Sequence, residues 1–121
     1  MFPCSHVPLF EGDPMGKVIK GSFPIAGEAS ASAFAIELET DAMTLGGLLP
    51  GDILVCEPEN VMPPKHGNAV VYLDNETVSS AKYYPPFLMP SSSNEEHKPV
   101  QLERDGIKMI GTIVYQVRYL V

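Results

Sequence analysis

The sequence lacks the features that mark several large classes of protein. It has two cysteines in 121 residues and no tryptophan, too few cysteines for a disulfide-stapled secreted scaffold. Cys4 and Cys56 could pair, but free thiols in a reducing cytosol are the simpler interpretation. No apolar run reaches membrane-spanning length, and no signal peptide opens the chain. These absences predict a cytoplasmic protein.

Basic residues are also scarce, with 8 lysines and arginines against 15 acidic residues and a net charge of −7. Because an acidic surface repels phosphate, the chain alone is a poor candidate for nucleic-acid binding. No helix-turn-helix pattern and no glycine-rich phosphate loop occur in it. The 45% of apolar residues, however, is typical of one globular domain with a real core.

Long helical patterns are missing as well, because ten glycines and twelve prolines are spread along the chain. Short runs with the two-residue period of half-buried strands take their place. We expect such strands near 16–23, 33–39, 53–56, 69–73, 77–84, 100–103, 107–110 and 112–121, with a short helical turn after Thr40. The sequence therefore predicts a mainly β fold with little helix, in which about six to eight strands form a small, partly closed barrel.

The pattern divides the chain into an arm or linker over 1–32, with one or two short strands, and a domain over 33–121. Asp74-Asn75 and Asp105-Gly106 are each expected to close a hairpin. The last run alternates well, which predicts one apolar face made of Ile113, Tyr115, Val117, Tyr119 and Val121. Its other face mixes apolar and polar residues, so we expect a long edge strand there that pairs with a second copy.

Few residues stand out as candidates for chemistry. The histidines and cysteines share no metal-ligand spacing, so we expect no metal site from His6, His66, His97, Cys4 and Cys56. The acidic residues at 37, 39 and 41 are more typical of a solvated face than of a carboxylate pair. Lys82 lies in a strand-like run between small and aromatic neighbours. A desolvated lysine there could act as a general base, whereas one that reaches water would have no such role.

The order of segments carries a resemblance. Val7-Pro8-Leu9 is followed by TDAM at 40–43, GLLPGDILV at 47–55, GNAVVYLDNETV at 67–78, Lys82, LMPSSSNEEHKPV at 88–100 and IGTIV at 110–114. This colinear series resembles the C-terminal domain of LexA-type and phage CI-type repressors and of UmuD-type mutagenesis proteins. These are self-cleaving serine peptidases with a Ser–Lys dyad, related in fold to signal peptidases. The resemblance covers about nine-tenths of the chain.

One position departs from the family pattern. The family has G-D-S-M or G-N-S-M where this chain has Thr40-Asp41-Ala42-Met43, so Ala42 stands at the nucleophile position. Alanine has no nucleophilic atom, and the dyad cannot operate with it. Two explanations fit: an engineered replacement that freezes the uncleaved form, which we favour at this point, or a natural member that has lost cleavage. With serine at position 42, the resemblance implies Lys82 as general base and the Ala42 and Met43 amides as the oxyanion site.

The resemblance also implies a substrate and partners. The substrate would be the protein's own linker, with Met15-Gly16 as the preferred scissile bond and Ala26-Gly27 as the alternative. The chain would be the C-terminal part of a longer repressor of the SOS or prophage type, forming a homodimer or a higher oligomer. A RecA filament or an antirepressor would inactivate it, and no cofactor is implied. The alternatives are a UmuD-like subunit that binds a DNA polymerase, a natural non-cleaving oligomerisation module, and an inert β-barrel interaction module.

Overall fold

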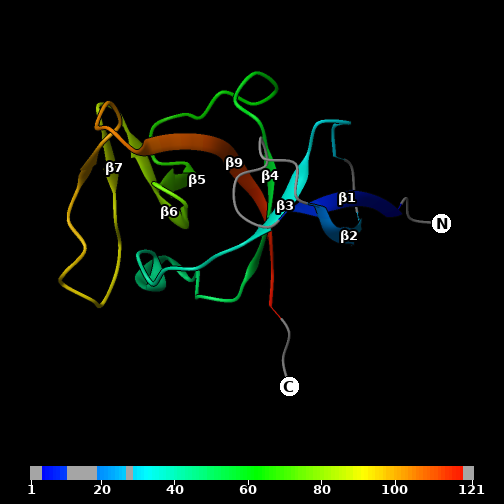
Figure 1. Cartoon of the computed structure of the whole chain (residues 1–121), viewed down its shortest axis with the longest axis horizontal. Helices are drawn as coiled ribbons and strands as arrows, with labels where there is room; N and C mark the ends of the chain where they lie inside the picture. The colour runs from blue at the N-terminus through cyan, green and yellow to red at the C-terminus, as the bar shows by residue number, and fades with distance from the viewer. Residues whose placement is uncertain (1–3, 11–18, 27–28, 119–121) are drawn as a thin grey trace.

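A computed structural model of the chain describes residues 4–10, 19–26 and 29–118. These residues form one mixed sheet with the strand order β2-β1-β3-β4-β9-β5-β6-β7-β8. The strands are β1 (Cys4–Phe10), β2 (Ile19–Ala26), β3 (Phe34–Glu37), β4 (Ile53–Glu57), β5 (Ala69–Asp74), β6 (Thr77–Tyr84), β7 (Phe87–Met89), β8 (Val100–Gln101) and β9 (Ile107–Val117). Figure 1 shows β5 to β7 on one side of the molecule and β1 to β3 on the other, with β9 crossing between them.

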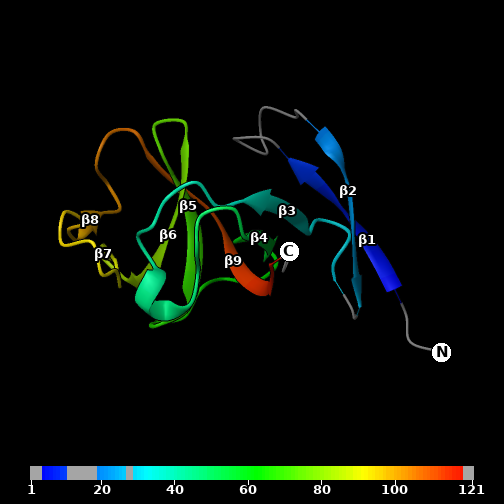
Figure 2. The same ribbon diagram turned by 90° about the horizontal axis from the view of Figure 1, so that it is seen from below.

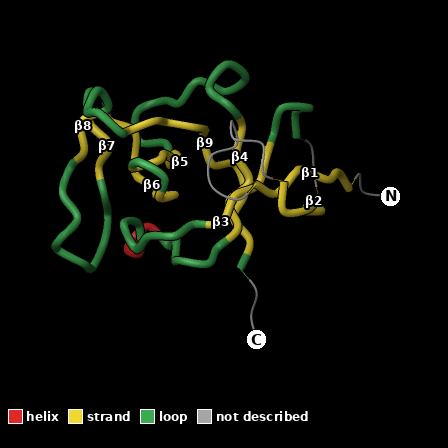
Figure 3. Tube along the Cα trace, in the orientation of Figure 1, coloured by secondary structure: helices red, strands yellow, loops and turns green. Residues whose placement is uncertain are grey.

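The prediction of a mainly β fold with little helix is confirmed, and the sheet is open rather than a closed barrel. Within the described residues the helical element is a 3-10 turn over Thr44–Gly46, which Figure 3 shows in red. The sheet does not close, because β2 and β8 lie at its two ends and each pairs with one neighbour. The strands at one end belong to the predicted arm. β1 and β2 pair with each other, and β1 also pairs in parallel with β3 through Leu9↔Ala35.

The core divides into clusters on the two faces of the curved sheet. The largest contains Ile36, Leu54, Val71 and Val78, together with Met43 from the turn before the 3-10 helix. A second cluster lies over β1, β3 and β4, and a third over β5 to β7. Cys56 is a free thiol in the first cluster. Burial raises the pKa of this thiol and keeps it protonated.

The last strand corrects two expectations. β9 is not an edge strand as a whole, because residues 107–112 pair with β5 and residues 112–117 pair with β4 (Figure 2). Its side chains do not alternate onto one apolar face either. A bulge opposite Val55/Cys56 turns the strand over, so that Ile113 packs against the first cluster while Val114 and Val117 pack against the second.

Polar residues at the end of β9 hold the turn that precedes β4. Asp52 is 1% exposed. Its carboxylate accepts hydrogen bonds from Leu49 N at 2.8 Å and from the Gln116 side chain at 2.9 Å. The Arg118 guanidinium donates two more, at 2.7 and 2.8 Å. Arg118 and Gln116, which lie on the face of the last run expected to form the interface with a second copy, are thus engaged with their own chain.

The two predicted hairpins have different outcomes. β5 and β6 pair in unbroken register around Asp74-Asn75, and Asn75 adopts φ 57°, as a tight turn requires. Asp105-Gly106 also forms a turn, but the strands on either side of it are not neighbours. β8 pairs with β7, whereas β9 pairs with β5 and β4. β8 lies beside β7, where Val100 pairs with the completely buried Leu88.

Candidate functional site

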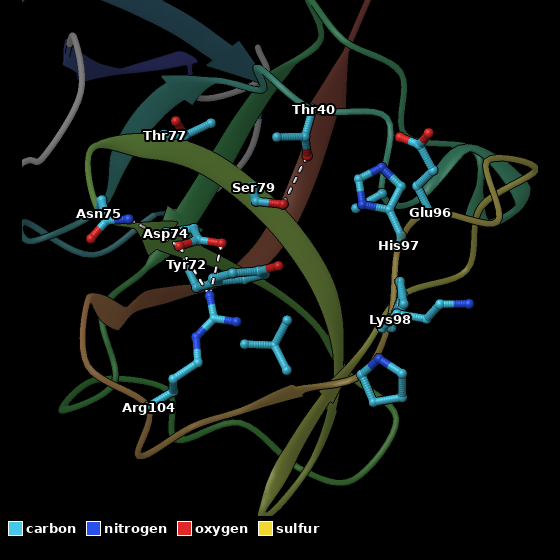
Figure 4. A pocket seen from close by; sticks show the side chains of 14 residues that line it. Thr40, Tyr72, Asp74, Asn75, Thr77, Ser79, Glu96, His97, Lys98 and Arg104 are labelled. Atoms are coloured by element: carbon cyan, nitrogen blue, oxygen red, sulfur yellow. Dashed lines mark hydrogen bonds and ion pairs between the residues drawn. The ribbon is translucent and has the colours of Figure 1, made fainter.

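Position 42 lies in the wall of a polar cleft. Ala42 is 1% exposed and comes just before Met43, which caps the 3-10 turn. It lines a cavity of about 560 Å³ together with residues of β5 and β6 and of the segment after β7. The lining residues are Thr40, Ala42, Tyr72, Asp74, Asn75, Thr77, Ser79, Pro90, Glu96, His97, Lys98, Pro99, Val100 and Arg104. Figure 4 shows these side chains from close by.

Hydroxyl groups line the floor of the cleft. The Thr40 and Ser79 hydroxyls are 2.8 Å apart and hydrogen-bonded to each other, as Figure 4 shows. Burial raises the pKa of the neighbouring Tyr72, although the Ser79 hydroxyl acts to lower it. Beside this floor, Arg104 donates to both carboxylate oxygens of Asp74 at 3.1 Å. The floor is therefore neutral and already hydrogen-bonded.

The segment from Pro90 to Pro99 forms the opposite wall and is tied to the turn at position 42. Ser91 N donates to Ala42 O at 2.9 Å, and the Ser92 hydroxyl donates to Asp41 O at 2.5 Å. The Asp41 carboxylate accepts from the Asn94 amide at 3.3 Å and contacts His97 Nε2 at 2.5 Å. The hydrogen bond with His97, and then that with Asn94, lower the pKa of Asp41. Asp41 thus joins the two walls of the cleft.

The structure does not bring the two members of the expected dyad together. Ser79 pairs with Tyr72 and Lys82 pairs with Ala69 in a register without bulges. Side chains alternate along a strand, so Lys82 shares the face of Val78 and Ser80, whereas Ser79 projects from the other face. Val78 belongs to the apolar core and Ser79 lines the cleft, while Lys82 is half-buried outside the cleft lining. Ser79, rather than Lys82, accompanies Ala42.

The other expected site residues have varied positions. Neither the Ala42 nor the Met43 amide N–H donates a hydrogen bond within the described part of the chain, as an oxyanion site would require. The Met15-Gly16 bond lies outside the described residues, and so does Gly27. Ala26 is the last residue of β2 and pairs with Cys4. Among residues 4–10, 19–26 and 29–118, no group of three or more acidic, histidine or cysteine side chains could hold a metal ion.

The sequence did not predict that Ser79 and His97 line one cleft, or that His97 contacts Asp41. A usable signal for Ser79 was present, because the Asp74-Asn75 turn fixes the register of β6 and strand alternation then separates residues 79 and 82. No local pattern joins Asp41 to His97, which are 56 residues apart in the sequence. Their contact depends on the path of the irregular segment after β7.

Comparison with known proteins leaves the family open. No family model matches this chain, and no curated protein sequence is significantly similar to it. No helix in the described ranges is long and apolar enough to cross a membrane. The cleft, whose lining includes Ala42 and the hydroxyl side chains of Thr40 and Ser79, is therefore the main evidence on function.

Proposed function

We propose that this chain is the non-cleaving, self-associating domain of a cytoplasmic repressor of the LexA or phage CI type. The observation that carries the proposal is the content of the cleft. Ala42 stands at the nucleophile position, and the β6 side chain that accompanies it is a serine hydrogen-bonded to Thr40. Ser–Lys cleavage needs an oxygen nucleophile and a neutral amine within reach of it. Position 42 supplies no oxygen, and the amine in the cleft lining belongs to exposed Lys98 rather than to Lys82, so we favour natural loss of cleavage over a single engineered replacement.

Self-association is supported by the second half of β9. Residues 113–117 pair with β4 along one edge, and within the described part of the chain no strand pairs with their other edge. Backbone groups on such an edge can pair with the same strand of a second copy around a two-fold axis. Tyr115, in the middle of this stretch, is 38% exposed. Exposed aromatic side chains of this size are typical of protein interfaces. The proposed dimer therefore forms across residues 113–117.

Sedimentation of the chain at micromolar concentration tests this proposal. We expect a dimer, and we expect Tyr115→Asp to weaken it at least tenfold, because a carboxylate would be buried in the contact. Phe87→Asp is the matched control, since Phe87 is an aromatic residue that is also 38% exposed and lies on β7, which does not pair with β9. A monomeric parent chain would contradict the proposal. A dimer that Tyr115→Asp leaves intact would contradict the surface.

The absence of cleavage is tested with the same protein. The parent chain and Ala42→Ser should both stay intact over days at high pH, where a lysine base would be neutral, as judged by mass spectrometry. Cleavage of Ala42→Ser at one bond, abolished by adding Lys82→Ala, would show that the dyad operates from Lys82. That result would restore the interpretation that a single replacement inactivates this chain.

A further inference from the structure

A second cavity lies where the predicted arm meets the rest of the sheet. Its volume is about 710 Å³, which is within the range of pockets that hold a small organic molecule. It shares no lining residue with the polar cleft around Ala42. We propose that this cavity binds a small organic cation, in which an apolar or aromatic body carries an amine. The proposal goes beyond the proposed function, because it depends neither on self-association nor on the loss of cleavage.

Four segments that are far apart in the sequence build the walls of this cavity. They are residues 8 and 10 of β1, residues 31–34, residues 58–60 after β4 and residues 108–110 of β9. Successive side chains of β1 point to opposite faces of the sheet. Val7 and Leu9 pack into the second cluster, whereas Pro8 and Phe10 line the cavity. The cavity therefore depends on the pairing of β1 with β3, which holds the arm against the body.

Two phenylalanine rings give the cavity an aromatic wall. The Phe10 and Phe34 rings pack edge to face, with their centroids 6.2 Å apart and an angle of 78° between their planes. Phe34 can approach β9 closely because residue 111 is a glycine, and a Cβ there would lie 3.1 Å from Phe34 Cζ. Met109 and Ile110 of β9 add aliphatic surface to the lining. Such a lining suits an apolar or aromatic group, and the flexible Met109 side chain can adapt to its shape.

The charged groups of the lining indicate the charge of the ligand. They are Glu59 and Lys108, and Lys108 already has a partner. The Glu59 carboxylate is exposed, and no group in the described part of the chain donates a hydrogen bond to it or forms an ion pair with it. The carboxylate is therefore the charge that a ligand can complement, in a chain whose net charge is already −7. An ammonium group meets this requirement, and the faces of aromatic rings attract cations as well.

Three probes that share one apolar body test the proposal. Phenylbutylamine, phenylbutanol and phenylbutyrate carry a cationic, a neutral and an anionic group at neutral pH, and each is titrated into the parent chain by NMR. We expect the amine to bind about threefold more tightly than the alcohol and about tenfold more tightly than the carboxylate, because an exposed ion pair contributes little. The amine should also raise the melting temperature, because a ligand that binds only the folded state stabilises it.

Two variants and one control locate the binding. Glu59→Gln should lower the affinity for the amine to that for the alcohol, whereas Glu95→Gln, which removes an exposed carboxylate outside the lining, should leave it unchanged. Ala31→Trp introduces a large ring at an exposed position of the lining and should weaken the binding of all three probes at least tenfold. Circular dichroism establishes that each variant is folded.

Each contrary outcome overturns the proposal in a different way. If no probe binds, the cavity is not a ligand site. Equal affinities for the amine and the alcohol, or amine binding that Glu59→Gln leaves unchanged, would overturn the assignment of a cation. An amine that binds the folded Ala31→Trp variant as tightly as the parent would be bound elsewhere on the acidic surface, which would overturn the site. Amine binding to a monomeric chain would support this proposal and contradict the proposed function.

Discussion

Asp52 offers a quantitative test of how the turn before β4 is held in place. Its carboxylate is almost completely buried and receives hydrogen bonds from Leu49 N, Gln116 and Arg118. The Arg118 hydrogen bonds, working against burial, lower its pKa from 3.8 to about 2. A shift of that size corresponds to about 2 kcal/mol of stability at pH 7. Asp52→Asn keeps the shape but removes the charge, so it should cost at least that amount.

The same shift fixes the sign of the pH dependence. A carboxyl whose folded pKa is depressed stabilises the fold above its unfolded pKa, and this contribution is lost as the pH falls through the folded value. The contribution of Asp52 should be complete above about pH 5, about half gone near pH 3 and nearly absent below about pH 2. The difference in unfolding free energy between parent and Asp52→Asn should therefore shrink as the solution is acidified.

Urea unfolding at pH 7, 5 and 3, followed by circular dichroism, measures this difference. Asp105→Asn is the control, since Asp105 lies on an exposed turn, and we expect it to change stability by less than about 0.5 kcal/mol. Arg118→Met should move the acid-induced loss of stability toward higher pH, because Asp52 loses its strongest partner. A difference between parent and Asp52→Asn that stays constant from pH 7 to pH 3 would refute the reasoning.

Two further predictions concern the core. A Cβ at Gly111 would lie 2.9 Å from Glu57 O and 3.1 Å from Cys56 Cβ, so Gly111→Ala should destabilise the fold by about 1–3 kcal/mol in urea unfolding. Unchanged stability would mean that β9 does not approach β4 this closely. Ser80 is completely buried and its hydroxyl has no hydrogen-bond partner among the described residues. Ser80→Ala should therefore raise the unfolding free energy by about 1 kcal/mol, and a loss of stability would indicate a bound water or another partner for the hydroxyl.

The sequence was informative about local structure because strands and tight turns have short-range causes. The buried run Ile53–Cys56 and the alternation from Phe34 onward correspond to β4 and β3. The Asp74-Asn75 turn likewise forms as expected, with Asn75 at positive φ. Each of these depends on side-chain periodicity or on the conformational range of one or two residues. Neighbouring residues in the sequence are enough to determine them.

Strand pairing between distant segments was harder to predict. Gly106 suggested that β8 and β9 form a hairpin, yet the turn leads from β8 to a strand that pairs with β5 and β4. The two bulges in β9 had no clear signal either, and each one reverses the faces of the residues that follow it. The prediction of one apolar face was therefore wrong for Ile113 and Val117, which pack against different clusters, while Tyr119 and Val121 lie outside the described residues.

Which residues of β6 line the cleft depends on the same alternation of side chains between the two faces of a strand. A lysine near the end of β6 fits the family pattern when the chain is read as a line, but a strand has two faces and residues 79 and 82 lie on different ones. Under the proposed function, a chain that had lost only a serine at position 42 would still hold a buried lysine amine in the cleft. Its floor instead contains Ser79 bonded to Thr40. The Thr40 and Ser79 hydroxyls bond to each other and need no general base. This supports our proposal that Ala42 is one part of a site that no longer cuts.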